Sequence, residues 1–175
     1  MRKLLVVVDM QNDFIDGALG TPEAAAIVEN VKQKIREYRP EDIFATMDTH
    51  GPDYLKTQEG RNLPVEHCIK GTGGWKIRPD IAELLDGARV FEKPTFGSVE
   101  LAREISKIAA GEDIEIEIIG LCTDICVASN ALLLKAYMPE VTICVDPDCC
   151  AGVTPESHEA ALRTMEMCQI HRRQS

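Results

Sequence analysis

The chain has 175 residues, of which 45% are hydrophobic and 27% are charged. This length suits one domain with a full core and is too short for two, so we expect residues 1–175 to form a single domain. A formal net charge of −10 argues against binding to nucleic acid or to an anionic membrane surface, and it favours small-molecule partners. Seven cysteines, an odd number, do not suit a disulfide framework. With no secretory segment and no apolar run long enough to cross a bilayer, we predict a cytoplasmic protein.

Strand-like and helix-like segments alternate along the chain, which is typical of a parallel sheet covered on both faces. The first predicted strand is almost entirely Val and Leu, as expected for a strand buried on both sides. The basic tail 169–175 leaves little room for a sixth strand. We predict a three-layer α/β/α fold around a mostly parallel central sheet of five to six strands. The predicted strands lie at 3–8, at 43–47, from 90 onward, at 115–119 and at 141–145.

N-capping residues mark where three of the helices begin. Thr21, Ser98 and Thr154 each precede a segment with apolar residues at helical spacing. A fourth helix is predicted over 124–137. In the last helix we expect these side chains to face inward: Ala161, Leu162, Met165 and Cys168.

Two stretches do not follow this alternation. Residues 49–80 are polar and Gly-rich, and a stretch of that length without regular structure is usually functional or poorly ordered. Within it, Trp75 either covers a pocket or anchors the loop. Cys149-Cys150 is interpreted as part of the turn that closes the fifth strand. The cysteine spacing lacks the C-x-x-C pattern, so a redox or thiol-metal site is disfavoured.

Three predicted strands lead into reactive side chains. Asp9 follows the first strand, Lys93 ends the third, and Cys126 lies in the first helical turn after the fourth. Alone, each has an ordinary interpretation, as a turn cap, a solvated amine and a core thiol. Because parallel strands share one carboxyl edge, the three together predict an activated nucleophile. The helix N-terminus and Lys93 would stabilise the thiolate, Asp9 would move its proton, and the backbone N–H groups of turn 120–126 would face a developing oxyanion.

Three motifs resemble the signatures of the isochorismatase-like cysteine hydrolases, and among them the nicotinamidases most closely. The motifs are Asp9-Met10-Gln11-Asn12-Asp13-Phe14, Glu92-Lys93-Pro94 with Phe96-Gly97-Ser98, and Gly120 to Val127, and they occur in the family's order. The resemblance extends over residues 3–168. It implies that Asp9 is the general base and acid, that Lys93 supports the thiolate and that Cys126 is the nucleophile.

The resemblance also implies the rest of the site. The backbone amides of Cys122 and Cys126 correspond to the oxyanion hole, Leu121–Cys122 to a non-proline cis peptide, and Phe14 to an aromatic residue that lines the substrate ring pocket. Isochorismatases that cleave a vinyl ether lack the thiol, so Cys126 favours carbon–nitrogen hydrolysis. The implied enzyme converts nicotinamide and water to nicotinate and ammonia through a thioester, a reaction of pyridine nucleotide biosynthesis. Members are commonly dimers or tetramers, so a homo-oligomer is implied.

A second group of residues predicts a metal site. Asp48 and His50 are separated by one residue, Thr49, just past a strand end, and His67 lies in the irregular stretch. One carboxylate and two imidazoles suit Zn²⁺, Mn²⁺ or Fe²⁺, although spacing alone is more often that of a hydrogen-bonded loop. The resemblance implies a divalent metal ion here, with zinc the first choice, that holds the pyridine nitrogen of the substrate. Glu59 stands where some relatives place an additional carboxylate ligand.

Departures from the nicotinamidase pattern leave other functions open. Thr49 stands where many nicotinamidases carry an aromatic residue, and a common Thr-Ala pair is missing from 127–130. One rival is an amidase for another small carboxamide or carbamoyl compound. The other is a non-catalytic metal- or ligand-binding protein that kept the fold. His158 is interpreted as an ordinary polar helix residue and His171 as an exposed one.

Overall fold

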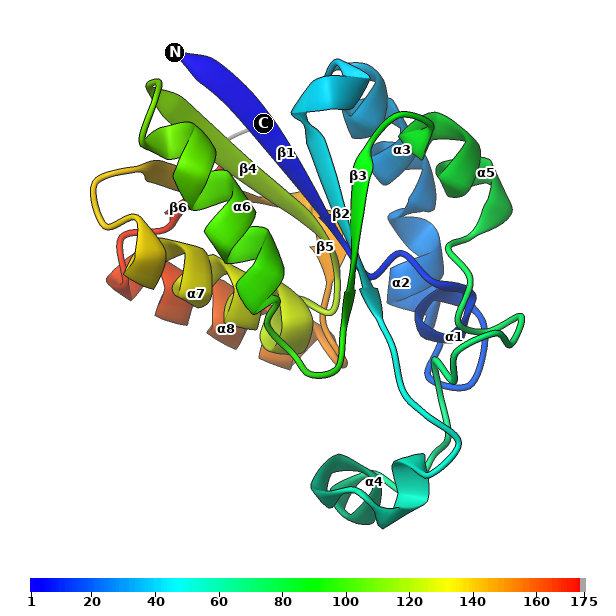
Figure 1. Ribbon diagram of the computed structural model, residues 1–175. Helices are drawn as coiled ribbons and strands as arrows, with labels where there is room; N and C mark the ends of the chain where they lie inside the picture. Colours follow the sequence, from blue (N-terminus) through cyan, green and yellow to red (C-terminus); the bar gives the residue numbers. More distant parts are fainter. Residues whose placement is uncertain (174–175) are drawn as a thin grey trace.

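The computed structural model describes residues 1–173. Its centre is one sheet of six strands in the order β3-β2-β1-β4-β5-β6, and every neighbouring pair is parallel. The predicted three-layer α/β/α fold is confirmed (Figure 1). The strands are β1 (Arg2–Val8), β2 (Ile43–Asp48), β3 (Arg89–Lys93), β4 (Ile114–Leu121), β5 (Thr142–Ala151) and β6 (His171–Arg172).

Helices cover both faces of the sheet (Figure 1). One layer consists of α6 (Val99–Ala109), α7 (Ala128–Tyr137) and α8 (Pro155–Met167). The other consists of α1 (Asn12–Ile15), α2 (Pro22–Ala26), α3 (Val28–Arg36) and α5 (Pro79–Ala82). A short arm with η2 (Tyr54–Lys56) and α4 (Gln58–Asn62) extends away from both layers. The remaining helical turns are η1 (Pro40–Asp42), η3 (Glu83–Leu85) and η4 (Thr123–Val127).

Alternate residues of β1 divide the core into two clusters. Leu4, Val6 and Val8 pack toward α6, α7 and α8, while Leu5 and Val7 pack toward the opposite layer. All five are at most 1% exposed. This explains the continuous apolar run, because a strand covered on both faces needs no polar side. Within residues 1–173, no helix combines the length and the apolar character that crossing a bilayer requires.

The predicted N-caps are confirmed. The side chains of Thr21, Ser98 and Thr154 each accept a hydrogen bond from the backbone N–H three residues on, in α2, α6 and α8. The helix predicted after Thr21 is interrupted at Ile27, which separates α2 from α3. The stretch 49–80 is less irregular than its composition suggests, because short helical turns too brief for a periodic pattern lie within it.

Two predictions about the carboxyl-terminal third are wrong, and the sheet has the larger of the predicted five to six strands. Cys149 and Cys150 lie within β5, because the strand resumes its pairing with β4 after a bulge between Val145 and Cys150. A sixth strand does form, since a two-residue segment is enough to pair with β5. Cys168 is exposed at the end of α8, where the chain turns toward β6 and Ile170 takes the buried position instead.

Candidate active site

The predicted reactive residues meet where the strand order reverses. β2 and β3 lie on one side of β1, and β4, β5 and β6 lie on the other. In parallel α/β sheets such a reversal of the strand order opens a crevice at the carboxyl ends of the strands. Asp9 directly follows β1, Lys93 is the last residue of β3, and Cys126 lies in η4 after β4. Because β3 is two strands from β1, only a side chain as long as lysine reaches back across β2 to Asp9.

Lys93 joins the other two groups. Its Nζ lies 2.7 Å from Asp9 Oδ2 and 3.3 Å from Cys126 Sγ. Asp9, Lys93 and Cys126 are 0%, 1% and 5% exposed. The convergence that the strand ends predict is therefore present, and water has little access to it.

Neighbouring groups hold the Asp9 carboxylate and the Lys93 ammonium in place. The Thr46 hydroxyl donates to Asp9 Oδ1 at 2.7 Å, and Lys93 Nζ donates to the Thr95 carbonyl at 3.1 Å. Asp9 itself has a φ of 48°, so the backbone turns sharply where β1 ends. Thr46 is not among the predicted site residues; a polar residue directly after three apolar ones in strand β2 is the signal that points to it.

Burial sets the protonation of the site. Desolvation raises the pKa of Cys126 well above that of an ordinary thiol; Asp9 raises it further, partly through a hydrogen bond from the thiol, and Lys93 opposes the shift. Burial also raises the pKa of Asp9, against the lowering effect of Lys93. For Lys93, burial lowers the pKa, but the charges of Asp9, Cys126 and Asp48 outweigh it and raise the pKa overall. These shifts favour the protonated thiol, and Asp9 is the adjacent group that can receive its proton.

The turn that carries Cys126 is well fixed. The Leu121–Cys122 peptide is cis, as the resemblance implies, and η4 is a π-helical turn that leads into α7. The buried Asn130 amide donates to the Cys126 carbonyl at 2.8 Å, and its Oδ1 accepts from the Ser98 N–H at 2.9 Å. Asn130, a buried polar residue of α7, thus connects the thiol-bearing turn to the loop that follows Lys93.

The turn is also tied to α8. The Thr123 hydroxyl lies 2.8 Å from Nδ1 of His158. His158 therefore has a specific partner next to the active site, whereas the sequence suggests only an ordinary polar residue. The ring of His171, in β6, is exposed as expected.

The predicted metal-ligating residues also come together. Asp48, His50, Glu59 and His67 each offer one ligand atom, and these four atoms lie within 4.8 Å of one another. Asp48 Oδ2 lies 2.9 Å from His50 Nε2 and 3.5 Å from His67 Nε2. Glu59 reaches the same place from α4 on the extended arm, with Oε1 3.6 Å from His50 Nε2.

The protonation of this cluster suits a cation. Nδ1 of His67 lies 2.8 Å from the Val65 carbonyl, so a proton on Nδ1 leaves the lone pair of Nε2 facing Asp48. Burial alone would raise the pKa of Asp48, but His50, His67 and Lys93 lower it overall, so this carboxylate is ionised. Two carboxylates and two imidazoles around one point form a ligand set suited to a divalent transition metal.

One small cavity is bordered by members of both groups: Cys126 from the first, and Asp48, Glu59 and His67 from the second. Its volume is about 50 Å³. Outside it, a wider cavity of about 590 Å³ shares Glu59, Leu63, Phe96 and Ile125 with it. The inner cavity is lined by Phe14, Leu19, Asp48, Glu59, Leu63, His67, Phe96, Cys122, Ile125 and Cys126.

Two aromatic residues singled out in the sequence have different positions. Phe14 is in the wall of the inner cavity, with its ring centroid 5.6 Å from that of His67. Trp75 instead donates from Nε1 to the Thr49 hydroxyl at 2.9 Å, and its carbonyl accepts from Gln11. Of the two interpretations of Trp75, the loop anchor is the one that these contacts support.

Comparison with known proteins identifies the family of the chain. The profile of the Isochorismatase domain matches residues 3–173. The chain is 25% identical to the nicotinamidase/pyrazinamidase of Mycobacterium tuberculosis over 96% of both sequences. It is 27% identical to the pyrazinamidase of Pyrococcus horikoshii, solved in complex with zinc, with a TM-score of 0.80 over 100% of both chains. It is 28% identical to the N-carbamoylsarcosine amidase of Thermoplasma acidophilum, with a TM-score of 0.77 over 99% of this chain and 96% of that one.

These relatives share the fold over nearly the full length of the chain, so the motifs that resemble the family's signatures belong to one common architecture rather than to short chance matches. With a family profile matched over residues 3–173, the chain belongs to the isochorismatase family.

Proposed function

We propose that this protein is a cysteine-dependent amidase that hydrolyses nicotinamide to nicotinate and ammonia. The observation that carries the proposal is the contact of Lys93 with both Asp9 and Cys126, beside a cavity that the metal-ligating cluster also borders. Family membership and the amidases among the relatives make the chain an amide-hydrolysing enzyme. The choice of nicotinamide follows from the relative in M. tuberculosis and from the cluster of imidazoles and carboxylates.

In the first half of the reaction, the Cys126 sulfur attacks the amide carbonyl while its proton passes to Asp9. The backbone N–H groups of Cys122 and Cys126 donate to the oxyanion of the tetrahedral intermediate. Asp9 then gives the proton to the amide nitrogen, which leaves as ammonia, and the acyl group remains on sulfur as a thioester. Lys93 stays protonated and offsets the negative charge that moves between sulfur and carboxylate.

In the second half, Asp9 takes a proton from a water molecule that attacks the thioester carbonyl. The tetrahedral intermediate collapses with release of the Cys126 sulfur, which recovers the proton from Asp9. One carboxylate thus serves as base and acid in both halves. Its raised pKa suits that role, because a group that exchanges protons during turnover works best when its pKa lies near the working pH.

Asp48, His50 and His67, with Glu59, would hold the divalent metal, and zinc is the first choice because the relative from P. horikoshii was solved with zinc. When bound, the metal supplies a Lewis-acidic partner for the pyridine nitrogen and orders nearby water. Phe14 supports the ring from the cavity wall. Cytoplasmic location and a homo-oligomeric state remain predictions.

Ammonia release from nicotinamide by the purified protein tests the proposal. We expect the Cys126→Ala variant to lose at least about 10³-fold in kcat/KM, because the proposed thioester forms on the Cys126 sulfur. Cys168→Ala, which changes an exposed cysteine at the end of α8, should leave the rate unchanged. Equal ammonia release by wild type and Cys126→Ala would contradict the assignment of the nucleophile.

A second candidate substrate class is a carbamoyl compound or another small carboxamide. The observation in its favour is the 28% identity with the N-carbamoylsarcosine amidase of T. acidophilum. Turnover of a panel that contains nicotinamide, pyrazinamide and N-carbamoyl amino acids separates the two. We expect kcat/KM to be highest for the pyridine amide, and a higher value for a carbamoyl compound would favour the second candidate.

A further inference from the structure

The first motif supplies more than a catalytic carboxylate and a ring-pocket aromatic. Between Asp9 and Phe14 lie Gln11, Asn12 and Asp13, and the mechanism above uses none of them. The side chains of Gln11 and Asp13 bond the main chain of Asp48 and of Cys68, the residue after His67, rather than the ligand atoms themselves. They come from one short segment but reach ligands that lie far apart in the sequence.

The Gln11 side chain takes the place of a peptide group beside β2. The backbone of β1 turns away after Val8, at Asp9. Beyond that point the Asp48 N–H donates to Gln11 Oε1 at 2.8 Å, and Gln11 Nε2 donates to the Asp48 carbonyl at 2.8 Å. Nε2 also donates to the Trp75 carbonyl at 2.7 Å. Gln11 is 0% exposed, so these bonds form without competition from water and fix the residue whose carboxylate joins the cluster.

The Asp13 carboxylate holds the other side of the cluster. Its Oδ2 accepts the N–H of Cys68 at 2.8 Å, and its Oδ1 accepts the N–H of Ala18 at 3.3 Å. Cys68 directly follows His67 and has a φ of 47°, a backbone conformation that non-glycine residues seldom adopt. The Gly-rich loop packs directly on Asp13, since a Cβ at Gly74 would lie 2.2 Å from its carboxylate oxygens.

We propose that Gln11 and Asp13 are positioning residues of the metal site. Gln11 fixes Asp48 through its main chain, and Asp13 fixes His67 through the N–H of Cys68. The inference rests on the metal site of the proposed function. Ligands that approach one ion from separate loops bind well only if their backbones are held at the right separation, and outer groups of this kind typically change metal affinity by about 10- to 100-fold.

Asn12 provides a matched control. It lies between the two positioning residues, is part of the same motif and donates from Nδ2 to the Gly73 carbonyl at 2.8 Å. That bond is exposed, and it ends on a residue that flanks no metal-ligating position. A variant at Asn12 therefore changes the motif and one hydrogen bond without loosening Asp48 or His67.

The zinc dissociation constant, measured by competition with a chromophoric chelator, tests the proposal. We expect Asp13→Ala to weaken zinc binding by about 10- to 100-fold, and Gln11→Glu to weaken it similarly because a carboxylate would face the Asp48 and Trp75 carbonyls. Asp13→Asn keeps one acceptor for the Cys68 N–H and should recover most of the affinity. Asn12→Ala should bind zinc like wild type. Nicotinamide turnover by Asp13→Ala should return when zinc is raised above the new dissociation constant.

The outcomes separate this inference from the proposed function. Wild-type affinity in both Asp13→Ala and Gln11→Glu would overturn the positioning roles and leave the amidase proposal intact. A wild-type chain that binds no zinc while still hydrolysing nicotinamide would overturn the metal site and the positioning roles together. Thermal unfolding of the metal-free variants identifies any that do not fold. If Asp13→Ala is one of them, Gln11→Glu decides: a folded Gln11→Glu that binds zinc as tightly as Asn12→Ala would overturn the inference.

Discussion

The carboxyl and the amino ends of the strands form two edges of the sheet, and each edge holds a buried carboxylate paired with a lysine. The two edges differ in the other side chains that surround the pair. At the carboxyl edge, Asp9 pairs with Lys93 at 2.7 Å. Toward the amino edge, Glu117 of β4 lies 3.1 Å from Lys34 and accepts a hydrogen bond from the Tyr38 hydroxyl at 2.5 Å. Both carboxylates are at most 2% exposed, so burial and charge pairing alone do not distinguish the two clusters.

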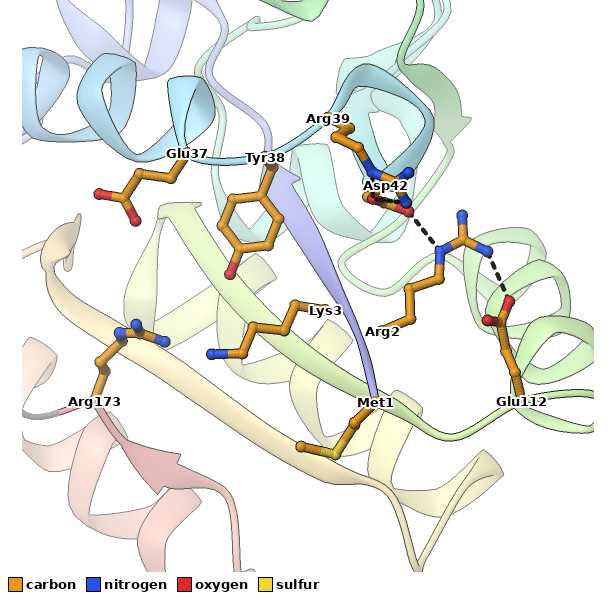
Figure 2. A pocket seen from close by; sticks show the side chains of 9 residues that line it. All are labelled: Met1, Arg2, Lys3, Glu37, Tyr38, Arg39, Asp42, Glu112 and Arg173. Atoms are coloured by element: carbon orange, nitrogen blue, oxygen red, sulfur yellow. Dashed lines mark hydrogen bonds and ion pairs between the residues drawn. The ribbon is translucent and has the colours of Figure 1, made fainter.

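Cavity size does not distinguish them in the expected direction either. A cavity beside the amino-edge cluster has a volume of about 670 Å³ (Figure 2), against about 50 Å³ for the inner cavity at the carboxyl edge. Tyr38 and Arg173 line the larger cavity and bond Glu117, which does not line it. The described side chains around the larger cavity carry guanidinium, ammonium, carboxylate, phenol and thioether groups. In Figure 2, Arg2 and Arg39 are bonded to Asp42, and Arg2 also to Glu112. The smaller cavity is bordered by the Cys126 thiol, so the presence of a nucleophile, and not volume, identifies the site.

Replacing each lysine by methionine should show the functional difference between the two clusters most clearly. Lys93→Met removes the positive charge beside the thiol and the Asp9 carboxylate, so we expect kcat/KM for nicotinamide to fall by about 10²- to 10⁴-fold. Lys34→Met leaves Glu117 and Asp146 without their shared cation, while Arg173 still pairs with Glu117 at 3.0 Å; we therefore expect a loss of about 1 to 3 kcal/mol in unfolding free energy. Its kcat/KM should stay within about twofold of wild type.

Steady-state kinetics and urea unfolding of both variants measure this contrast. Folded Lys93→Met with wild-type activity would contradict the catalytic interpretation of the carboxyl edge. A large loss of kcat/KM in folded Lys34→Met would show that the amino-edge cluster acts on the reaction, which the separation of the two cavities does not predict.

The next largest effect should come from removing divalent metal. The metal-ligating cluster at the carboxyl edge contains two imidazoles. In the amino-edge cluster the Glu117 and Asp146 carboxylates are paired with the Lys34 ammonium group, which is not a metal ligand. We expect dialysis against a chelator to raise the KM for nicotinamide by at least about tenfold and zinc to restore it. Alkylation of Cys126, followed by mass spectrometry, should be little changed, and unchanged kinetics after complete metal removal would contradict the role given to the cluster.

The meeting of Asp9, Lys93 and Cys126 can be predicted from the sequence because all three lie at or just past strand ends. Position relative to a parallel strand fixes which edge a side chain reaches, so the order of the strands and residues along the chain is enough to bring Asp9, Lys93 and Cys126 together. It is not enough for Thr46 and Asn130, because their roles depend on partners that are 37 and 32 positions away in sequence, respectively. A polar residue inside an apolar element indicates that some partner exists, but it does not identify which one.

The sequence is least decisive for short segments near chain turns. β6 is two residues long and pairs only because α8 returns the chain beside β5. The bulge in β5 places Cys149 and Cys150 back in the strand, although Pro147 and the surrounding aspartates are typical of a turn. In both cases tertiary contacts outweigh local composition. The periodicity of apolar residues cannot reveal strand pairings that involve so few residues.

The smallest predicted effect is a pH dependence of stability at the carboxyl edge. Burial lowers the pKa of His158, whose ring contacts the Thr123 hydroxyl in the turn that carries Cys126. As the pH falls through the unfolded-state value of about 6.5, the unfolded chain binds a proton that the folded chain resists, so the unfolding free energy falls. Wild type should therefore lose more stability between pH 7.5 and 5.5 than His158→Gln, which does not titrate and keeps an acceptor for Thr123. Urea unfolding at both pH values measures the difference, and parallel losses in the two proteins would show that the tie between α8 and the nucleophile turn is not sensitive to protonation.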